Sequence, residues 1–174
     1  MKLGTKNIKI LAYNEEAYID FLNGTIKSFN IPDGLIEIKS YLFYNCTALS
    51  SVTIPDSVTD IDNSAFKNCT SLTSITIPDS VTYIGYRAFE GCTNLTSVIL
   101  SNSLEDLSWY LFYNCTSLTS ITIPKSVTSI DYHAFDGCTN LTSITVEGKS
   151  EGEIKGAPWG ATNATVTWTG VGKI

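Results

Sequence analysis

The five cysteines of this chain are spaced at a constant interval of 23 residues, at positions 46, 69, 92, 115 and 138. Three apolar columns keep the same interval: Phe43, Phe66, Phe89, Phe112 and Phe135; Leu49, Leu72, Leu95, Leu118 and Leu141; and Val52, Ile75, Val98, Ile121 and Ile144. A repeat this regular predicts that each turn of the chain buries its apolar side only against its neighbours, so one repeat cannot fold alone.

Each repeat contains a short strand. In the segment 118–124, Ile121 and Ile123 alternate with Thr, which predicts a strand with an apolar inner face, and Pro124 ends it because proline lacks a backbone donor. The residue before each cysteine is Asn or Gly, which predicts a positive φ at that position. Residues 63–67 are too short for a long helix and predict one tight helical turn that places Phe66 in the core.

These elements together predict the fold class. A period of 20 to 29 residues with an L-x-x-I-x-I core is typical of leucine-rich solenoids. We therefore expect a predominantly β, right-handed α/β solenoid of about five 23-residue turns with degenerate caps, in which the strands stack in parallel.

The repeat motif resembles a known family. Residues 134–145 read Ala-Phe-Asp-Gly-Cys-Thr-Asn-Leu-Thr-Ser-Ile-Thr, and this pattern is similar to the BspA-type leucine-rich repeats of bacterial surface proteins over roughly residues 26–146. The resemblance implies that the cysteines occupy the interior site taken by Asn in ordinary leucine-rich repeats. It also implies adhesion and a cell-surface or secreted location.

The two ends of the chain depart from the repeat, as solenoid ends must. We expect an N-terminal cap over residues 1–25, with a strand and a short helix near 14–22, and repeats over 26–146. Residues 147–174 form a degenerate capping turn, in which we expect Trp159 or Trp168 to close the core. Its last strand, 166–168, is shifted by one residue from strict register. The segment 158–165 resembles end pieces of repeat proteins in Gram-positive surface proteins and phage tail-associated proteins.

Composition excludes several partners. A net charge of −6 and a pI near 4.6 argue against nucleic acid and anionic membranes, both of which select basic patches. No stretch approaches roughly 18 continuous apolar residues, so we expect no membrane insertion. No signal peptide is visible, so a phage particle or the cytoplasm also fits as the location.

Chemistry-bearing motifs are sparse. His133 is the sole histidine and the cysteines fall in one column, so we expect neither a metal site nor a cofactor. No phosphate loop or dinucleotide fingerprint is present. The acid pairs Asp60 with Asp62 and Glu105 with Asp106 read as solvated loop charges. We therefore expect no enzymatic activity.

Recognition can be encoded only in columns that vary from turn to turn, and these columns are rich in aromatic residues. Exposed Tyr and Trp give large contact areas at low entropic cost, although the same rings could instead lie half-buried over gaps in a thin core. The candidate contact residues for a protein or carbohydrate ligand are Tyr41, Tyr83, Tyr86, Arg87, Trp109, Tyr110, Tyr132 and His133.

The outward side of the strands is the alternative surface. It carries a ladder of hydroxyls that could match an ordered lattice such as ice, or could simply stabilise the sheet by cross-strand pairing. The alternative site residues are Thr53, Thr76, Thr122 and Thr145. The sequence thus predicts a non-catalytic recognition or adhesion module, with a structural or accessory part of a bacterial or phage surface assembly as the second class. It leaves the ligand and the oligomeric state open.

Overall fold

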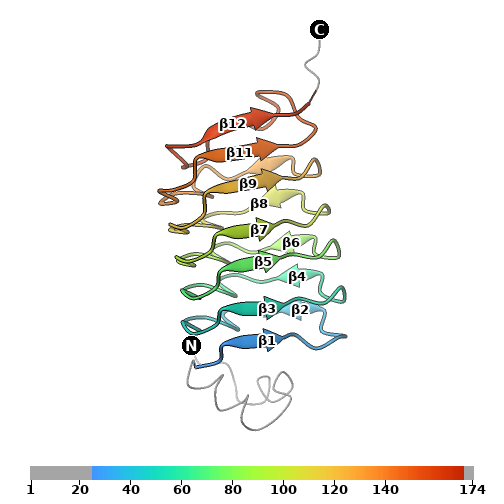
Figure 1. The fold of residues 1–174 in the computed structure, drawn as a ribbon. Helices are drawn as coiled ribbons and strands as arrows, with labels where there is room; N and C mark the ends of the chain where they lie inside the picture. The colour runs from blue at the N-terminus through green and yellow to red at the C-terminus, as the bar shows by residue number, and fades with distance from the viewer. Residues whose placement is uncertain (1–24, 171–174) are drawn as a thin grey trace.

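The computed structural model describes residues 25–170 and is a parallel β-solenoid of about six turns (Figure 1). One row of strands consists of β1 (Ser28–Asn30), β3 (Ser51–Thr53), β5 (Ser74–Thr76), β7 (Ser97–Ile99), β9 (Ser120–Ile123), β11 (Ser143–Val146) and β12 (Thr165–Trp168). The opposite row consists of β2 (Glu37–Ile38), β4 (Asp60–Ile61), β6 (Tyr83–Ile84), β8 (Asp106–Leu107) and β10 (Ser129–Ile130).

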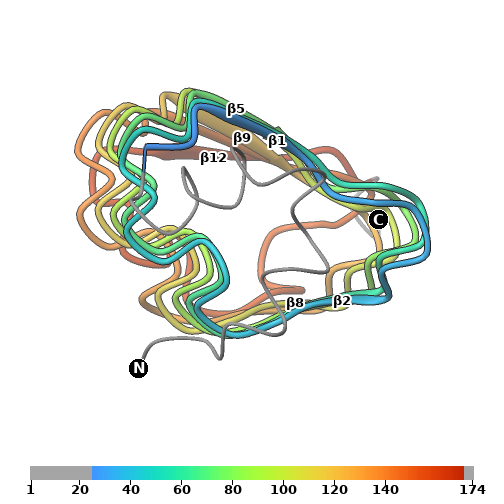
Figure 2. The same ribbon diagram turned by 90° about the horizontal axis from the view of Figure 1, so that it is seen from below.

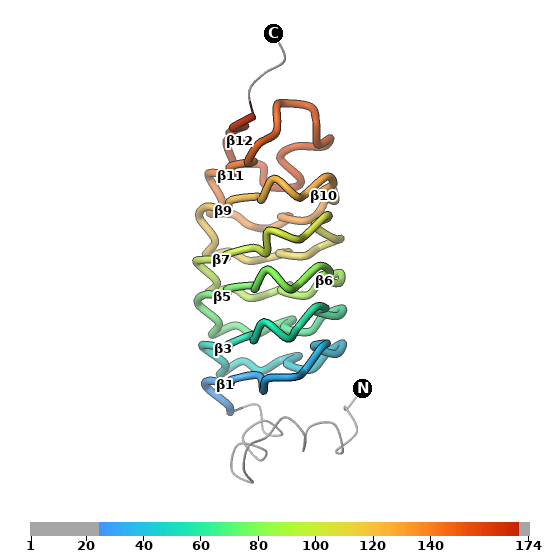
Figure 3. Tube along the Cα trace, turned by 90° about the vertical axis from the view of Figure 1, so that its right-hand side faces the viewer, coloured from blue at the N-terminus to red at the C-terminus, as the bar shows by residue number. Residues whose placement is uncertain are grey.

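All strand pairs are parallel and follow the repeat. Ser28 pairs with Ser51 and Ser120 with Ser143, one repeat apart in each case. Viewed along the axis, the turns superimpose and the two rows lie on opposite sides of one closed outline (Figure 2). From the side they form a regular stack of rungs (Figure 3). Only the last pair is offset, since Ser143 pairs with Thr165, which confirms the predicted shift of one residue.

A continuous stack of phenylalanine rings forms the centre of the core. Adjacent rings from Phe43 to Phe135 are stacked with centroids 4.9, 5.3, 5.7 and 5.7 Å apart. All five rings are fully buried. Because each ring stacks on the equivalent ring of a neighbouring turn, the stack couples the turns and fixes their register.

The cysteines form a second buried column beside this stack, and all five are free thiols. From the second cysteine onward, each Sγ donates to the carbonyl of the phenylalanine in the preceding turn, as in Cys92 to Phe66 at 3.2 Å. Burial raises the pKa of Cys46 to about 11 and those of Cys92 and Cys138 to about 12. The thiols are therefore neutral core donors.

The expectation of a helical turn at residues 63–67 is wrong, and the described residues contain no helix. The N–H groups of Phe66 and Asn68 donate to Ala88 and Glu90 in the next turn, whereas those of Lys67 and Cys69 bond three residues back. A helix would need every donor within the segment. In this segment, N–H groups that donate to the next turn instead alternate with N–H groups that donate within the same turn.

Positive φ angles recur at two positions of the turn. The predicted position before each cysteine is confirmed, with φ from 57° to 76° at Asn45, Asn68, Gly91, Asn114 and Gly137. A second column, not predicted, has φ from 55° to 63° at Tyr41, Ser64, Arg87 and Tyr110. Residues with a Cβ disfavour this conformation, and at Tyr41, Ser64 and Arg87 the backbone N–H donates to a carbonyl of the next turn.

The C-terminal cap closes the core as predicted. Trp159 is fully buried, and its Nε1 donates to the carbonyl of Lys155 at 2.7 Å. Trp168 on β12 is half-buried and meets Trp159 edge-on with centroids 6.1 Å apart. The helix expected near residues 14–22 lies outside the described residues, and the division at residues 25 and 146 stays a prediction.

We predict that the cysteines of the folded protein resist alkylation. At pH 8 the raised pKa values leave almost no thiolate, and thiolate is the reactive form. Native protein treated with iodoacetamide should remain unmodified by mass spectrometry, whereas all five thiols should react in guanidinium chloride. Rapid modification of two or more thiols in native buffer would contradict the buried column.

We also predict that two aromatic residues of one turn differ sharply in their effect on stability. Replacing the stacked ring in Phe89→Ala should lower the free energy of unfolding by about 3–5 kcal/mol, because it leaves a cavity in the stack. The exposed ring removed in Tyr86→Ala should cost less than about 1 kcal/mol. Urea denaturation followed by circular dichroism measures both, and equal losses would disprove the distinction.

Candidate functional site

The predicted contact residues lie on or directly after the short-strand row, where the chain leaves β2, β6, β8 and β10 and enters the turn. We call this surface the aromatic rim, and it comprises Tyr41, Tyr83, Tyr86, Arg87, Trp109, Tyr110, Tyr132 and His133. Three of its members, Tyr41, Arg87 and Tyr110, occupy the left-handed positions described above. Their backbones are fixed by hydrogen bonds to the next turn in two cases: Tyr41 N to Asn63 O and Arg87 N to Trp109 O.

The inner part of the rim is a stacked column. The Arg87 guanidinium lies 5.0 Å from the centroid of the Tyr110 ring, and that ring stacks on His133 at 5.4 Å with an interplanar angle of 15°. Residues three positions later support the column from behind: Glu90 lies 3.3 Å from Arg87, and Asp136 Oδ2 lies 2.8 Å from His133 Nδ1. These contacts make the column rigid.

The outer part of the rim consists of exposed rings. Tyr86, Trp109 and Tyr132 are 44%, 55% and 62% exposed. Trp109 leans on Tyr110 with centroids 5.7 Å apart. Tyr132 rests on Gly156, where an added Cβ would come within 2.4 Å of the ring. No ring contact joins these three residues to one another within 25–170, so they form a row of separate rings.

The rings of Trp109 and Tyr132 flank a shallow groove outside β8 and β10. It is lined in addition by Asp106, Ser108, Ser129, Asp131 and two strand residues. Burial, aided by the neighbouring charge of Glu105, raises the pKa of the Asp106 carboxyl. The groove thus combines aromatic walls with carboxylates.

Sequence reasoning missed Asp106 as a groove residue because it treated the pair with Glu105 as loop charges. The structure places Asp106 on strand β8, where it is half-buried and lines the same groove as Trp109. The signal was available in the repeat: Asp106 is 23 residues after Tyr83 and 23 before Ser129. All three therefore occupy the same outward position of the short-strand row.

The hydroxyl ladder of the strand face has an interruption at Ile99 that the sequence itself contains. Thr53, Thr76 and Thr122 are exposed and Thr145 is half-buried, but Ile99 interrupts them with 59% of its surface exposed. The row also divides into three hydrogen-bonded segments, β1–β3, β5–β7 and β9–β11–β12. This surface is therefore not one continuous hydroxyl lattice.

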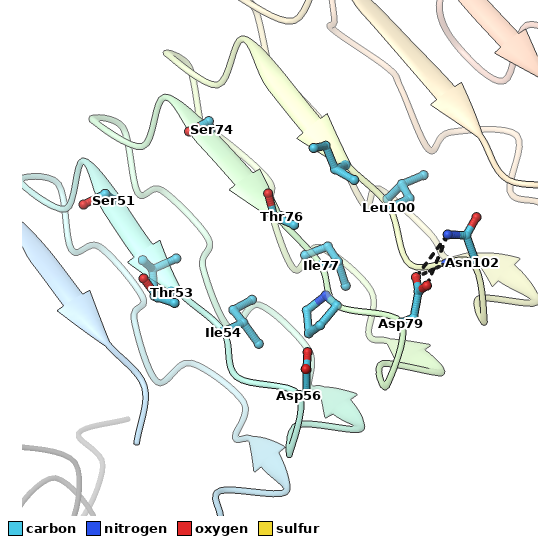
Figure 4. A pocket seen from close by; sticks show the side chains of 13 residues that line it. Ser51, Thr53, Ile54, Asp56, Ser74, Thr76, Ile77, Asp79, Leu100 and Asn102 are labelled. Carbon is cyan, nitrogen blue, oxygen red and sulfur yellow. Dashed lines mark hydrogen bonds between the residues drawn. The ribbon is translucent and has the colours of Figure 1, made fainter. Parts of the chain in front are cut away.

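A hollow lies where this row turns away at its carboxyl end. Figure 4 shows Thr53 and Thr76 on neighbouring strands, with Asp56, Asp79 and Asn102 beyond the carboxyl ends of the strands. Asn102 is held by Asp79, which accepts from its backbone N–H at 2.8 Å and from its side-chain amide. The hollow is polar and open, and it spans three turns.

Few of the described side chains form a reactive arrangement. His133 contacts Asp136 and Tyr110, and no hydroxyl or thiol donates to it among the hydrogen bonds of residues 25–170. Within the same residues, no three His, Cys, Asp or Glu side chains converge on a point that could hold a metal ion. No helix in this part of the chain is long and apolar enough to cross a membrane.

Comparison with known proteins identifies the family. The BspA type leucine rich repeat region matches residues 17–142 in six copies. The chain belongs to the BspA-type leucine-rich repeat family. The interior cysteine column and the phenylalanine stack are thus the core of repeats of this family. No curated protein matches the chain.

Several solved bacterial proteins share the fold. A leucine-rich repeat protein of T. pallidum is 28% identical with a TM-score of 0.68, over 83% of this chain and 70% of its own. One from Eubacterium ventriosum is 21% identical with a TM-score of 0.69, over 82% and 44%. A leucine-rich cell surface protein of Faecalibacterium prausnitzii is 21% identical with a TM-score of 0.52, over 88% and 62%. The chain thus spans less than two thirds of the latter two.

We predict that the ring of Tyr110 stabilises the inner column. Tyr110→Leu removes both the cation–π contact with Arg87 and the stack on His133, and should lower the free energy of unfolding by about 1–2 kcal/mol. Tyr110→Phe keeps the ring and is the matched control, with an expected loss below about 0.5 kcal/mol. Urea denaturation distinguishes the two, and equal losses would contradict a role of the ring.

Proposed function

We propose that this chain is a non-catalytic recognition module that contacts a protein or glycan at a cell surface through its aromatic rim. BspA-type leucine-rich repeat proteins are cell-surface proteins, and the family is associated with adhesion and protein binding. The observation that carries the proposal is that Trp109 and Tyr132 keep more than half of their surface exposed. Large aromatic residues of this kind are enriched at the energetic centres of interfaces.

The rigidity of the rim supports this function. The Trp109 ring contacts the Tyr110 ring at 5.7 Å, and the Tyr110 ring is itself packed between Arg87 and His133, which favours one position of Trp109 before a ligand binds. A preorganised surface loses less conformational entropy on binding than a mobile one. The rim therefore combines exposed contact area with low ordering cost.

A non-catalytic role is supported by the state of the nucleophiles. The thiols are neutral and enclosed in the core, so they offer no thiolate to a substrate. His133 is engaged by Asp136 on one side and by the Tyr110 ring on the other. The same contacts that stabilise the rim thus occupy its one histidine.

A structural or accessory role in a surface assembly is the second candidate, and one feature favours it. Strand β12 pairs with β11 on one side, and within residues 25–170 no strand pairs with its other edge. Half-buried Val166 and Trp168 lie along that strand beside a hollow formed by residues 151–158. An unpaired strand edge is a template for another chain, and end-to-end association in sedimentation velocity would support this role.

We predict that binding depends on the rim. The native chain is screened against arrays of extracellular proteins and of glycans, and Trp109→Ala and Tyr132→Ala are measured on each ligand found. Loss of a central aromatic anchor should weaken binding about 30-fold, while thermal melting changes little. Ile99→Ala, which removes an equally exposed apolar side chain from the strand face, should bind like the native chain.

Two results would contradict this assignment. A large fall in melting temperature of Trp109→Ala would identify that ring as a packing residue of the core rather than a contact residue. Loss of binding in Ile99→Ala, with normal binding by the two rim variants, would move the contact surface to the strand face.

A further inference from the structure

The outward surface of the short-strand row carries an excess of negative charge next to the rim. We call it the acidic face, and it comprises Glu37, Asp60, Asp62, Glu105, Asp106 and Asp131. The one lysine on this surface, Lys39, forms an ion pair with Glu37. Arg87 at its border is paired with Glu90. The lysines and arginines of residues 25–170 therefore leave most of this charge without an ion pair.

Four aspartates of this face form no ion pair within the described residues. Asp62 accepts from the Ser40 hydroxyl at 3.1 Å, and Asp131 accepts from the His133 N–H at 3.0 Å. Each of these carboxylates therefore has an oxygen that no other side chain engages. The field of the face is visible at Tyr83, whose phenol pKa is raised by burial and then by Asp62, Asp106 and Asp60.

The chain itself shows how a cation is held in this setting. The Arg87 guanidinium lies over the Tyr110 ring at 5.0 Å and contacts the Glu90 carboxylate at 3.3 Å. The groove presents the same two kinds of group, with the rings of Trp109 and Tyr132 beside the carboxylates of Asp106 and Asp131. No Lys or Arg of the described residues lines the groove. The groove is thus an aromatic and acidic pocket that lacks a cation.

We propose that the acidic face and the groove between Trp109 and Tyr132 bind an arginine- or lysine-bearing segment of a protein partner. This inference rests on the proposed function and names the ligand chemistry of the same rim. A side-chain cation between the rings gains cation–π attraction and pairs with the free carboxylate oxygens. The net charge of −6 steers such a segment toward the protein. The hydroxyls of a neutral sugar can donate to the aspartates but bring no positive charge to match them.

The test uses the full chain and a short fluorescent peptide of alternating arginine and glycine. A peptide with citrulline in place of arginine is the control ligand, because citrulline keeps the shape and loses the charge. The double variant Asp106→Asn with Asp131→Asn keeps a hydrogen-bond acceptor at both sites. The control double variant, Asp33→Asn with Asp56→Asn, makes the same charge change at exposed positions near the carboxyl ends of the other strand row.

We expect the arginine peptide to bind the native chain and the citrulline peptide to bind at least tenfold more weakly. The groove variant should bind the arginine peptide about five- to tenfold more weakly, in line with the loss of two partly exposed charge pairs. The control variant should lie within about twofold of the native chain, and higher salt should weaken native binding. Trp109→Ala should lose affinity in the same assay.

Equal loss of affinity in the two double variants would overturn the inference, since it would show attraction to the overall charge alone. The array screen could instead yield a ligand, such as a neutral glycan, that requires the rim but binds equally well at high salt and to the groove variant. That result would overturn the inference and leave the proposed function intact. A ligand that requires Ile99 and neither Trp109 nor the aspartates would instead contradict both.

Discussion

Each turn of this solenoid is stable only because it packs between two others. The phenylalanine rings illustrate the constraint: every ring from Phe66 to Phe112 has one ring above and one below, 4.9 to 5.7 Å away. The same dependence governs the backbone, where the N–H of Phe66 and that of Asn68 find their acceptors in the following turn. The stability of such a chain is therefore a sum of contributions from individual turns and from the interfaces between adjacent turns.

This constraint separates the residues that build the fold from those that can vary. Positions that point inward must stack on identical or similar side chains, so Phe, Leu and Cys recur unchanged. Positions that point outward from the short-strand row lie outside the core, and there the residue type changes from turn to turn: Glu37, Asp60, Tyr83, Asp106 and Ser129. The repeated backbone supports the aromatic rim next to them, while the side chains of the rim can differ from one turn to the next.

The repeat made most of the architecture predictable. Constant spacing of Cys46 and its counterparts gives the turn length, and Asn or Gly before each cysteine gives the positive φ. The turn at residues 63–67 was predicted wrongly because its donors are satisfied by a neighbouring turn, which local propensity does not reveal. The left-handed conformation of Tyr110 was also not predicted, because a residue with a Cβ rarely adopts it. The groove needs side chains from β8 and β10 together, so only the assembled stack shows that Asp106 lies beside Trp109 and Tyr132.

The buried thiol column has a consequence for how the chain reaches its folded state outside a reducing environment. Once folded, all five sulfurs are buried, and four of them donate to a carbonyl of the preceding turn, so no exposed thiolate is offered to an oxidant. Before folding, the same five thiols lie on one flexible polymer and can pair with each other or with another molecule. An odd number guarantees that at least one would stay available for an intermolecular bridge. In an oxidising medium, the yield of native protein therefore depends on the rate of folding relative to the rate of thiol oxidation.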